Sequence, residues 1–212
     1  MKRLMLIAAF WLAAIPAAQA DISWECRQVV RGEGWPTRTK TIRHYHTPNQ
    51  SRMDIGENVM IADFGTMTGY VLNTNDKMFL KMSMHNVGKI PEGLKEEIQV
   101  QPTGDVRKIA GYTSRRYRVR FMERTYDEWL SKEVPGYREL RAINDRLAPL
   151  TRQHPLFQMG IIGRMDRLDG FPVRQVMRLG DGRIKTVTLQ RVSRDPIDPS
   201  VFRVPPGYGK PY

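Results

Sequence analysis

The sequence contains a single cysteine, Cys26, among its 212 residues. One thiol cannot form an intramolecular disulfide. Cys26 shares a face of the first expected strand with Trp24 and Gln28, so we expect it to be a small buried side chain rather than a reactive or dimer-forming thiol. Histidine is also scarce, and neither an HExxH pattern nor a cysteine pair is present. The sequence therefore lacks the common zinc-site patterns.

Long apolar runs are missing after the first twenty residues. Those residues, MKRLMLIAAFWLAAIPAAQA, combine a basic start, a short apolar run and small side chains at Ala18 and Ala20. This is the layout of a secretory signal peptide, and the run is shorter than the roughly 20 residues that span a bilayer. We predict that residues 1–20 are a signal peptide cleaved before Asp21. Residues 21–212 would then form a single exported, soluble periplasmic domain.

Recognisable catalytic patterns are absent too: there is no Gly-rich phosphate loop, no G-x-S-x-G elbow and no Cys/His nucleophile spacing. His44 and His46 would share one strand face, as metal ligands can, but two exposed strand histidines are the simpler interpretation. Met82, Met84 and His85 could bind Cu(I), although such methionines are more often core side chains. We expect no enzyme activity, metal or cofactor, and a hydrolase or metal-binding protein is the third alternative.

Acidic residues are outnumbered by basic ones, with 22 Asp and Glu against 34 Lys and Arg and a net charge of +12. Loss of Lys2 and Arg3 with the leader leaves +10. Such a surplus favours lipid head groups, acidic polysaccharides or nucleic acid as partners, and export makes nucleic acid the least available of them. The charge surplus therefore indicates a surface that attracts anionic partners.

The stretch KIAGYTSRRYRVRF, residues 108–121, concentrates part of this charge. Its arginines at 116, 118 and 120 alternate with Tyr117, Val119 and Phe121. A one-sided antiparallel sheet produces this alternation, so a solvated outer face is the first interpretation. The functional hypothesis is that this face meets an anionic envelope surface or a protein partner through three side chains: Arg116, Arg118 and Arg120.

Short strand patterns separated by turn residues fill the first two thirds of the chain, and no βαβ rhythm is seen. Expected strands cover 22–31, 37–46, 50–55, 58–64, 69–73, 77–82, 96–101, 105–110, 113–122 and 124–130. Apolar residues at three- and four-residue steps then predict a helix over 136–150, within a helical insertion around 136–167. Two more strands, 171–179 and 183–193, flank a Gly-Asp-Gly turn. The expected fold is mainly β (α+β): one antiparallel sheet with a helical insertion.

At this level of detail the chain resembles a family of exported bacterial proteins of unknown function. That family has a strand with an I-A-G-Y-x-C-x-x-Y-x-V core before a Trp-containing strand and a helix, and it ends in F-x-V-P-x-G-Y. Its cysteine falls on Ser114, which removes any thiol-based role at that position. The matching residues are Ile109, Ala110, Gly111, Tyr112, Tyr117, Val119, Trp129, Phe202, Val204, Pro205, Gly207 and Tyr208.

The plan is more remotely similar to the periplasmic lipoprotein carriers with a LolA/LolB-like fold. There a curved antiparallel half-barrel, plugged by helices on its concave side, holds acyl chains. The resemblance implies a carrier, and flexible methionines suit pockets for apolar ligands of variable shape. The alternating apolar positions nominate a pocket: Met60, Phe64, Val71, Phe79, Tyr117, Val119, Phe121, Leu140, Ile143, Leu147 and Met177.

Two non-catalytic functions follow from these observations. The first is an exported binder or carrier of a hydrophobic ligand, such as a lipid or the acyl chains of a lipoprotein. The second is an envelope interaction or stress-response factor, in which the same side chains close on one another at ordinary core density and leave no cavity.

Overall fold

The computed structural model describes residues 21–85, 99–121, 124–151 and 168–210. They form strands and two helical segments. The strands are β1 (Ile22–Gly32), β2 (Trp35–His46), β3 (Gln50–Ile55), β4 (Asn58–Asp63), β5 (Thr68–Asn73), β6 (Met78–Ser83), β7 (Gln99–Ile109), β8 (Tyr112–Phe121), β9 (Arg124–Ser131), β10 (Phe171–Arg178) and β11 (Ile184–Ser193). The helices are α1 (Tyr137–Thr151) and the 3-10 helix η2 (Pro199–Phe202).

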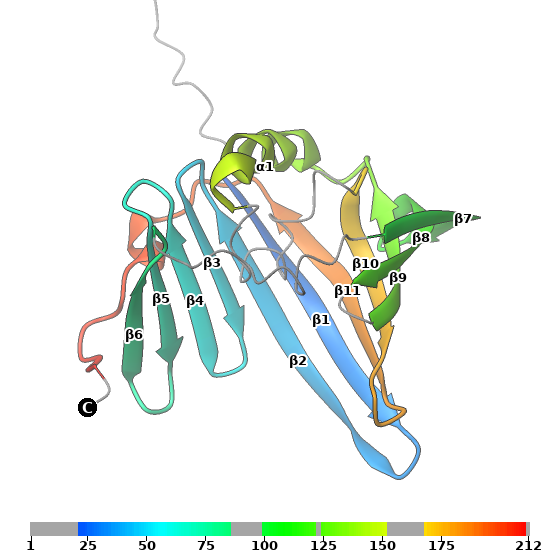
Figure 1. The fold of residues 1–212 in the computed structure, drawn as a ribbon, viewed down its shortest axis with the longest axis horizontal. Coiled ribbons are helices and arrows are strands. Elements are labelled where there is room, and N and C mark those ends of the chain that lie inside the picture. The colour runs from blue at the N-terminus through cyan, green and yellow to red at the C-terminus, as the bar shows by residue number, and fades with distance from the viewer. Residues whose placement is uncertain (1–20, 86–98, 122–123, 152–167, 211–212) are drawn as a thin grey trace, which may run out of the picture.

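These strands make one 11-stranded sheet in the order β6-β5-β4-β3-β2-β1-β11-β10-β9-β8-β7. Every neighbouring pair is antiparallel. The sheet is open, with β6 and β7 as its edges, and Figure 1 shows the strand direction turning steadily from one edge to the other. The expectation of a mainly β, antiparallel architecture is confirmed.

Strand β7 corrects one detail of the sequence analysis, which predicted two strands in this region. The strand runs continuously from Gln99 to Ile109. Its pairing with β8 shifts between Pro102 and Val106, and Gly104 lies there at φ +85°. A bulge of this kind absorbs extra residues without ending the strand, and glycine reaches positive φ without strain. The expected residues 96–98 lie outside the described part.

Helix α1 covers one face of the sheet, which we call the helix face. Its buried apolar stripe is the one that the three- and four-residue periodicity predicted: Tyr137, Leu140, Ile143 and Leu147. The first half of the helix joins the core over β1, β2, β10 and β11, and the second half packs with Phe64 and Met84. The second helical stretch expected up to residue 167 lies outside the described residues.

The opposite face, here called the tail face, is covered over β3–β6 by the C-terminal segment. Phe202 is buried there with Val59, Ile61 and Leu72. Arg52 anchors the segment, because its Nη1 donates to the carbonyl of Val201 at 2.7 Å. Figure 1 shows this segment beside the β6 end of the sheet.

The same segment also lies against the edge strand β6. Gly209 accepts a hydrogen bond from the amide of Phe79 and donates one to the carbonyl of Lys77, both at 2.9 Å. Met78 and Gly209 consequently form a parallel bridge. Backbone groups that an edge strand leaves unpaired are thus satisfied at this position.

Gly136, just before α1, lies at φ +81° and faces Ile22, which is almost fully buried. A Cβ at Gly136 would lie 2.4 Å from Ile22 Cδ1. We expect Gly136→Ala to lower the free energy of unfolding by about 2–3 kcal/mol, because it adds overpacking to left-handed strain. Gly182→Ala is the matched control, since φ is +82° there and nothing lies within 4 Å. Equal losses in urea denaturation of the two variants would contradict the packing argument.

Candidate functional site

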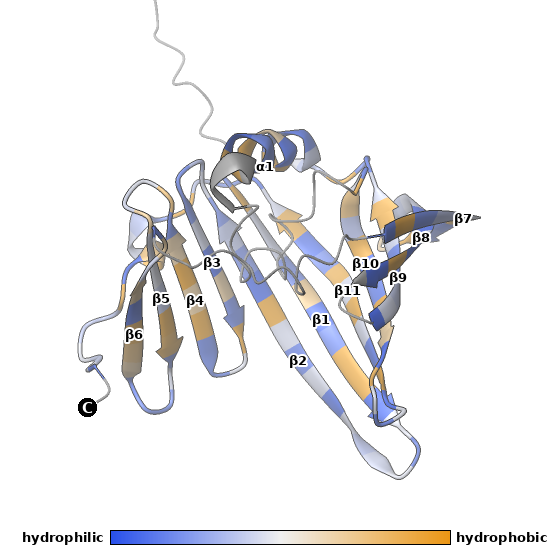
Figure 2. Cartoon of the chain, viewed as in Figure 1, coloured by the Kyte–Doolittle hydropathy of each residue, from blue (hydrophilic) through white to orange (hydrophobic). Residues whose placement is uncertain are grey.

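The helix face is only partly closed by α1, and its open part lies over β3–β6. Met53, Met60, Val71 and Leu80 form a row across these four strands, because each is the direct cross-strand partner of the next. Met60 is 40% exposed and Leu80 is 53% exposed. Figure 2 shows the hydrophobic colour along these strands.

A third methionine extends this row toward the helix. Met82 pairs with Gly69, and a Cβ at Gly69 would lie 3.0 Å from Met82 Cγ. The absence of a side chain at Gly69 therefore leaves room for Met82 to lie across β5. We call the set Met53, Met60, Val71, Leu80 and Met82 the methionine platform. Thioether side chains are polarizable and have several rotatable bonds, so such a surface adapts to apolar partners of different shape.

The sequence-predicted pocket residues divide between this platform and the closed core. Met60 and Val71 belong to the platform. The others on the helix face pack into buried clusters: Phe64, Ile143 and Leu147 in one, Leu140 in a second, and Val119 with half-buried Tyr117 and Met177 in a third. Phe121 ends β8, and its side chain lies outside the described part. In the described structure, the members of the set on the helix face come from the sheet and from α1, and they divide among three buried clusters and the platform.

Phe79 was expected on the same face, and this expectation is wrong. It is the cross-strand partner of Leu72 and packs on the tail face with Tyr70 and the C-terminal segment. The β5–β6 register pairs Val71 with Leu80 instead. Leu80 is therefore a platform residue that the sequence analysis missed, as are Met53 and Met82. An alternation of apolar residues shows which side chains of one strand share a face. It does not show the register between that strand and the next one.

An aromatic stack lies at the centre of the helix face, where β1 meets β2. The Trp24 ring is parallel to both imidazoles, with centroids 4.5 Å from His44 and 4.7 Å from His46. Phe171 meets Trp24 edge-on at 5.3 Å. The expectation of two exposed strand histidines is wrong, because His46 is 5% exposed and His44 is half-buried.

Burial controls the charge of these imidazoles. Desolvation, with a smaller contribution from the neighbouring His44, lowers the pKa of His46 to about 3. Desolvation likewise lowers the pKa of His44 to about 3. Both rings are therefore neutral at physiological pH, and the stack is an apolar element of the core. Within the described part of the chain, no group of three or more His, Cys, Asp or Glu side chains gathers as a metal site would require.

Buried thiol and amide groups complete the interior of this face. Cys26 is buried, as predicted, and desolvation raises the pKa of its thiol to about 12, with Glu25 adding to the shift. A thiol with that pKa is not nucleophilic at neutral pH. Asn144 on α1 is 1% exposed, and neither atom of its amide has a hydrogen-bond partner within the described structure.

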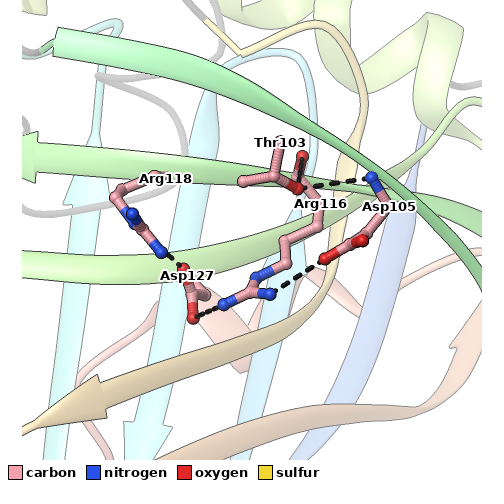
Figure 3. A network of polar contacts seen from close by, with 5 residues as sticks. All are labelled: Thr103, Asp105, Arg116, Arg118 and Asp127. Carbon is pink, nitrogen blue, oxygen red and sulfur yellow. Dashed lines mark hydrogen bonds and ion pairs between the residues drawn. The ribbon is translucent and has the colours of Figure 1, made fainter.

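The predicted anionic-partner arginines of β8 lie on the tail face, and two of the three are engaged by carboxylates (Figure 3). Arg116 donates to Asp127 at 2.5 Å and to Asp105 at 2.9 Å. The hydrogen bond to Asp127, and after it the one to Asp105, raises the pKa of the Arg116 guanidinium. Arg118 lies 3.8 Å from the same Asp127. Arg120 is exposed, so of the three only it presents an uncompensated charge.

Solved structures that align with this chain are 8–14% identical to it in sequence. The structure of PNGF-II in the C2 space group aligns at 14% identity with a TM-score of 0.47, over 89% of this chain and 30% of that chain. The chain thus spans about a third of the length of PNGF-II. A LolA superfamily protein from Nitrosomonas europaea aligns at 9% identity and a TM-score of 0.38, over 87% of this chain and 90% of that one.

A DUF1329 family protein from Desulfovibrio piger aligns at 8% identity with a TM-score of 0.36, over 88% of this chain and 91% of that one. A LolA superfamily protein is thus among the solved structures that align with this chain, and all three TM-scores lie below 0.5.

No helix in the described residues has the length and apolar character needed to cross a membrane. A comparison with curated proteins finds no match. The family model described as a domain of unknown function (DUF4412) matches residues 37–208, and the chain belongs to this family.

Proposed function

We propose that the protein is a non-catalytic binder or carrier of a lipid-like ligand, and that the ligand's apolar chain lies on the methionine platform. The observation that carries this proposal is that the two faces of β3–β6 differ in burial. Their tail face is buried under the C-terminal segment, whereas Met60 and Leu80 on the helix face are 40% and 53% exposed. Neighbouring exposed apolar side chains on a sheet are typical of an interaction site.

The platform suits an extended acyl chain in both shape and energy. A row of side chains that crosses four strands at about 4.8 Å spacing is roughly 15–20 Å long. Burial contributes about 0.8 kcal/mol for each methylene, so about ten buried methylenes would provide about 8 kcal/mol before the entropic cost of binding. The half-buried thioethers of Met53 and Met82 can repack around chains of different length.

The proposal includes export to the periplasm through the leader at residues 1–20. The position of strand β1 supports it, since β1 begins at Ile22, one residue after the expected cleavage site. The Asp21 carboxylate accepts a hydrogen bond from the amide of Ile197 at 2.9 Å, and Ile22 is almost fully buried. Cleavage before Asp21 would leave this start of the sheet intact.

The second candidate is an envelope interaction or stress-response factor without a ligand. A specific observation favours it, because protein side chains already bury five of the eleven predicted pocket positions: Phe64, Val119, Leu140, Ile143 and Leu147. The two candidates differ in one respect only, which is whether the methionine platform takes up an apolar molecule.

We expect saturable binding of a dansyl-labelled fatty acid, measured by probe fluorescence, and at least about tenfold weaker binding by Leu80→Lys. The charged side chain would stand at the β6 end of the platform row, where Leu80 is exposed. Val106→Lys is the matched control, because Val106 is also a strand residue that is 53% exposed but lies on β7, away from the platform. Solvent extraction and mass spectrometry of the purified protein would identify any lipid that accompanies it.

Two results would contradict the proposal. Wild-type protein that shows no saturable probe binding and carries no lipid would favour the ligand-free candidate. Equal binding by Leu80→Lys and Val106→Lys would place the ligand elsewhere on the molecule.

A further inference from the structure

The uncovered part of the tail face, over β1, β2 and β7–β11, is densely basic. One row of direct cross-strand partners reads Arg27, Thr188, Arg174, Trp129 and Arg116 from β1 to β8. Alternation along the strands places further arginines on this face. We call the whole set the arginine face: Arg27, Arg31, Arg43, Arg107, Arg116, Arg118, Arg120, Arg174, Arg178 and Arg191.

Carboxylates balance only part of this charge. Glu25 forms an ion pair with Arg43, and Asp105 forms one with Arg116. Asp127 forms ion pairs with both Arg116 and Arg118. Arg107 lies over the Trp129 ring, with its Cζ 5.5 Å from the centroid. In the described structure, the arginines of this face that lack a carboxylate within ion-pair distance are Arg27, Arg31, Arg107, Arg120, Arg174, Arg178 and Arg191.

The spacing of these groups is two-dimensional rather than linear. Adjacent strands are about 4.8 Å apart, so Arg27 on β1 and Arg174 on β10 are separated by about 10 Å across β11. Arg31 and Arg178 repeat the pattern further along the same strands, where both are direct partners of Ile184. Guanidinium groups bind phosphate oxygens in a bidentate fashion. A plane of phosphates matches such an array better than one extended polyanion does.

An exposed tryptophan lies at the end of this face. Trp35 begins β2 at the β1–β2 hairpin tip and is 53% exposed. Arg183, in the β10–β11 turn, places its Cζ 4.8 Å from the Trp35 ring centroid, so the two hairpin tips meet. Figure 1 shows both tips projecting together from the end of the sheet opposite α1. Tryptophan rings beside basic side chains are favoured at the head-group level of a bilayer.

We propose that the arginine face docks on an anionic lipid bilayer, with its guanidinium groups on the head-group phosphates and Trp35 at the head-group level. The platform lies on the opposite face of the sheet, so this inference does not depend on the ligand proposed for it. The protein would rest on the membrane with its β1–β2 and β10–β11 tips in the interface.

Vesicle sedimentation tests the electrostatic part. We expect the purified, exported protein to bind vesicles of equal parts phosphatidylglycerol and phosphatidylcholine, and to bind pure phosphatidylcholine much more weakly. Each cation near such a surface changes the partition coefficient about fivefold. Joint replacement of Arg27, Arg31 and Arg178 by Gln should therefore weaken binding on the order of 100-fold. All three side chains are exposed, which limits the effect on folding.

The matched control removes the same charge from elsewhere: Lys40→Gln, Lys108→Gln and Arg138→Gln together. Lys40 and Lys108 lie on the helix face by register, and Arg138 lies on α1. All three are exposed, and none belongs to the arginine face. Equal loss of vesicle binding by the two triple variants would reduce the effect to net charge and overturn the proposal.

Tryptophan fluorescence tests the orientation. Trp24 and Trp129 are buried, so a blue shift on addition of anionic vesicles should come from Trp35 and disappear in Trp35→Ser. A vesicle-induced shift that persists in Trp35→Ser would overturn the docking geometry. Heparin and double-stranded DNA are the competitors; tighter binding to either than to the vesicles would assign the face to a linear polyanion instead.

Discussion

Truncation of Trp129 to alanine is expected to lower the free energy of unfolding by about 3–5 kcal/mol, the usual cost for a buried aromatic side chain. Trp129 lies in the strand that the sequence analysis expected over residues 124–130, and the structure shows why its loss would be severe. The indole is 6% exposed, although its register partners on both sides are arginines, Arg116 and Arg174. Without the ring, two charged side chains would flank a cavity.

Trp35 provides the control for this experiment, because it is the same side chain on a strand of the same sheet but is 53% exposed. Trp35→Ala should cost less than about 1 kcal/mol. Guanidinium chloride unfolding followed by circular dichroism measures both variants without reliance on tryptophan emission. A loss below about 1 kcal/mol for Trp129→Ala would mean that this part of the sheet is not packed as described.

Acidification should destabilise the protein at pH values well above those at which carboxylates become protonated. His46 has a pKa of about 3 in the folded chain and about 6.5 when unfolded, so the unfolded chain binds the extra proton between these values. Stability is therefore fully present above about pH 6.5 and falls as the pH decreases toward 3. His46 alone should account for about 2 kcal/mol at pH 5 and about 3 kcal/mol at pH 4. His44 acts in the same direction.

His46→Phe isolates this effect, because phenylalanine keeps a ring against Trp24 and cannot be protonated. The free energy of unfolding of the variant should fall less between pH 7.5 and pH 5 than that of the wild type, by about 2 kcal/mol. His85→Gln is the control for loss of a histidine, since His85 is exposed. Parallel pH curves for the wild type and His46→Phe would show that the imidazole is solvated.

Local signals predicted the strands and the helix well. Hairpins such as β3–β4 and β10–β11 are marked by glycine in their turns, and the stripe of α1 by its own periodicity. The face of Phe79 could not be predicted in the same way. The turn into β6 holds Lys77 at φ +49°, and the resulting register pairs Asn73 with Met78. One residue more or less in that turn would exchange the faces of Phe79 and Leu80.

The candidate sites depended on contacts between segments that are distant in the chain. The sequence placed His44 and His46 on one face of a strand, but their burial comes from Trp24 on β1 and the core beneath α1. Likewise, the arginines of β8 were recognised, while the carboxylates that neutralise Arg116 come from β7 and β9. The sequence alone therefore does not show which arginines form ion pairs, because the strand order decides which carboxylates lie beside them.

The two ends of the sheet also decide whether molecules of this protein can polymerise. An open sheet can grow by adding a strand from another copy at either edge. At β6, Gly209 already occupies backbone positions that an incoming strand would use. At β7, Pro102 lacks an amide donor and the irregularity up to Val106 breaks the pairing pattern. Each edge thus carries its own obstacle to edge-to-edge aggregation, which high protein concentration would otherwise favour.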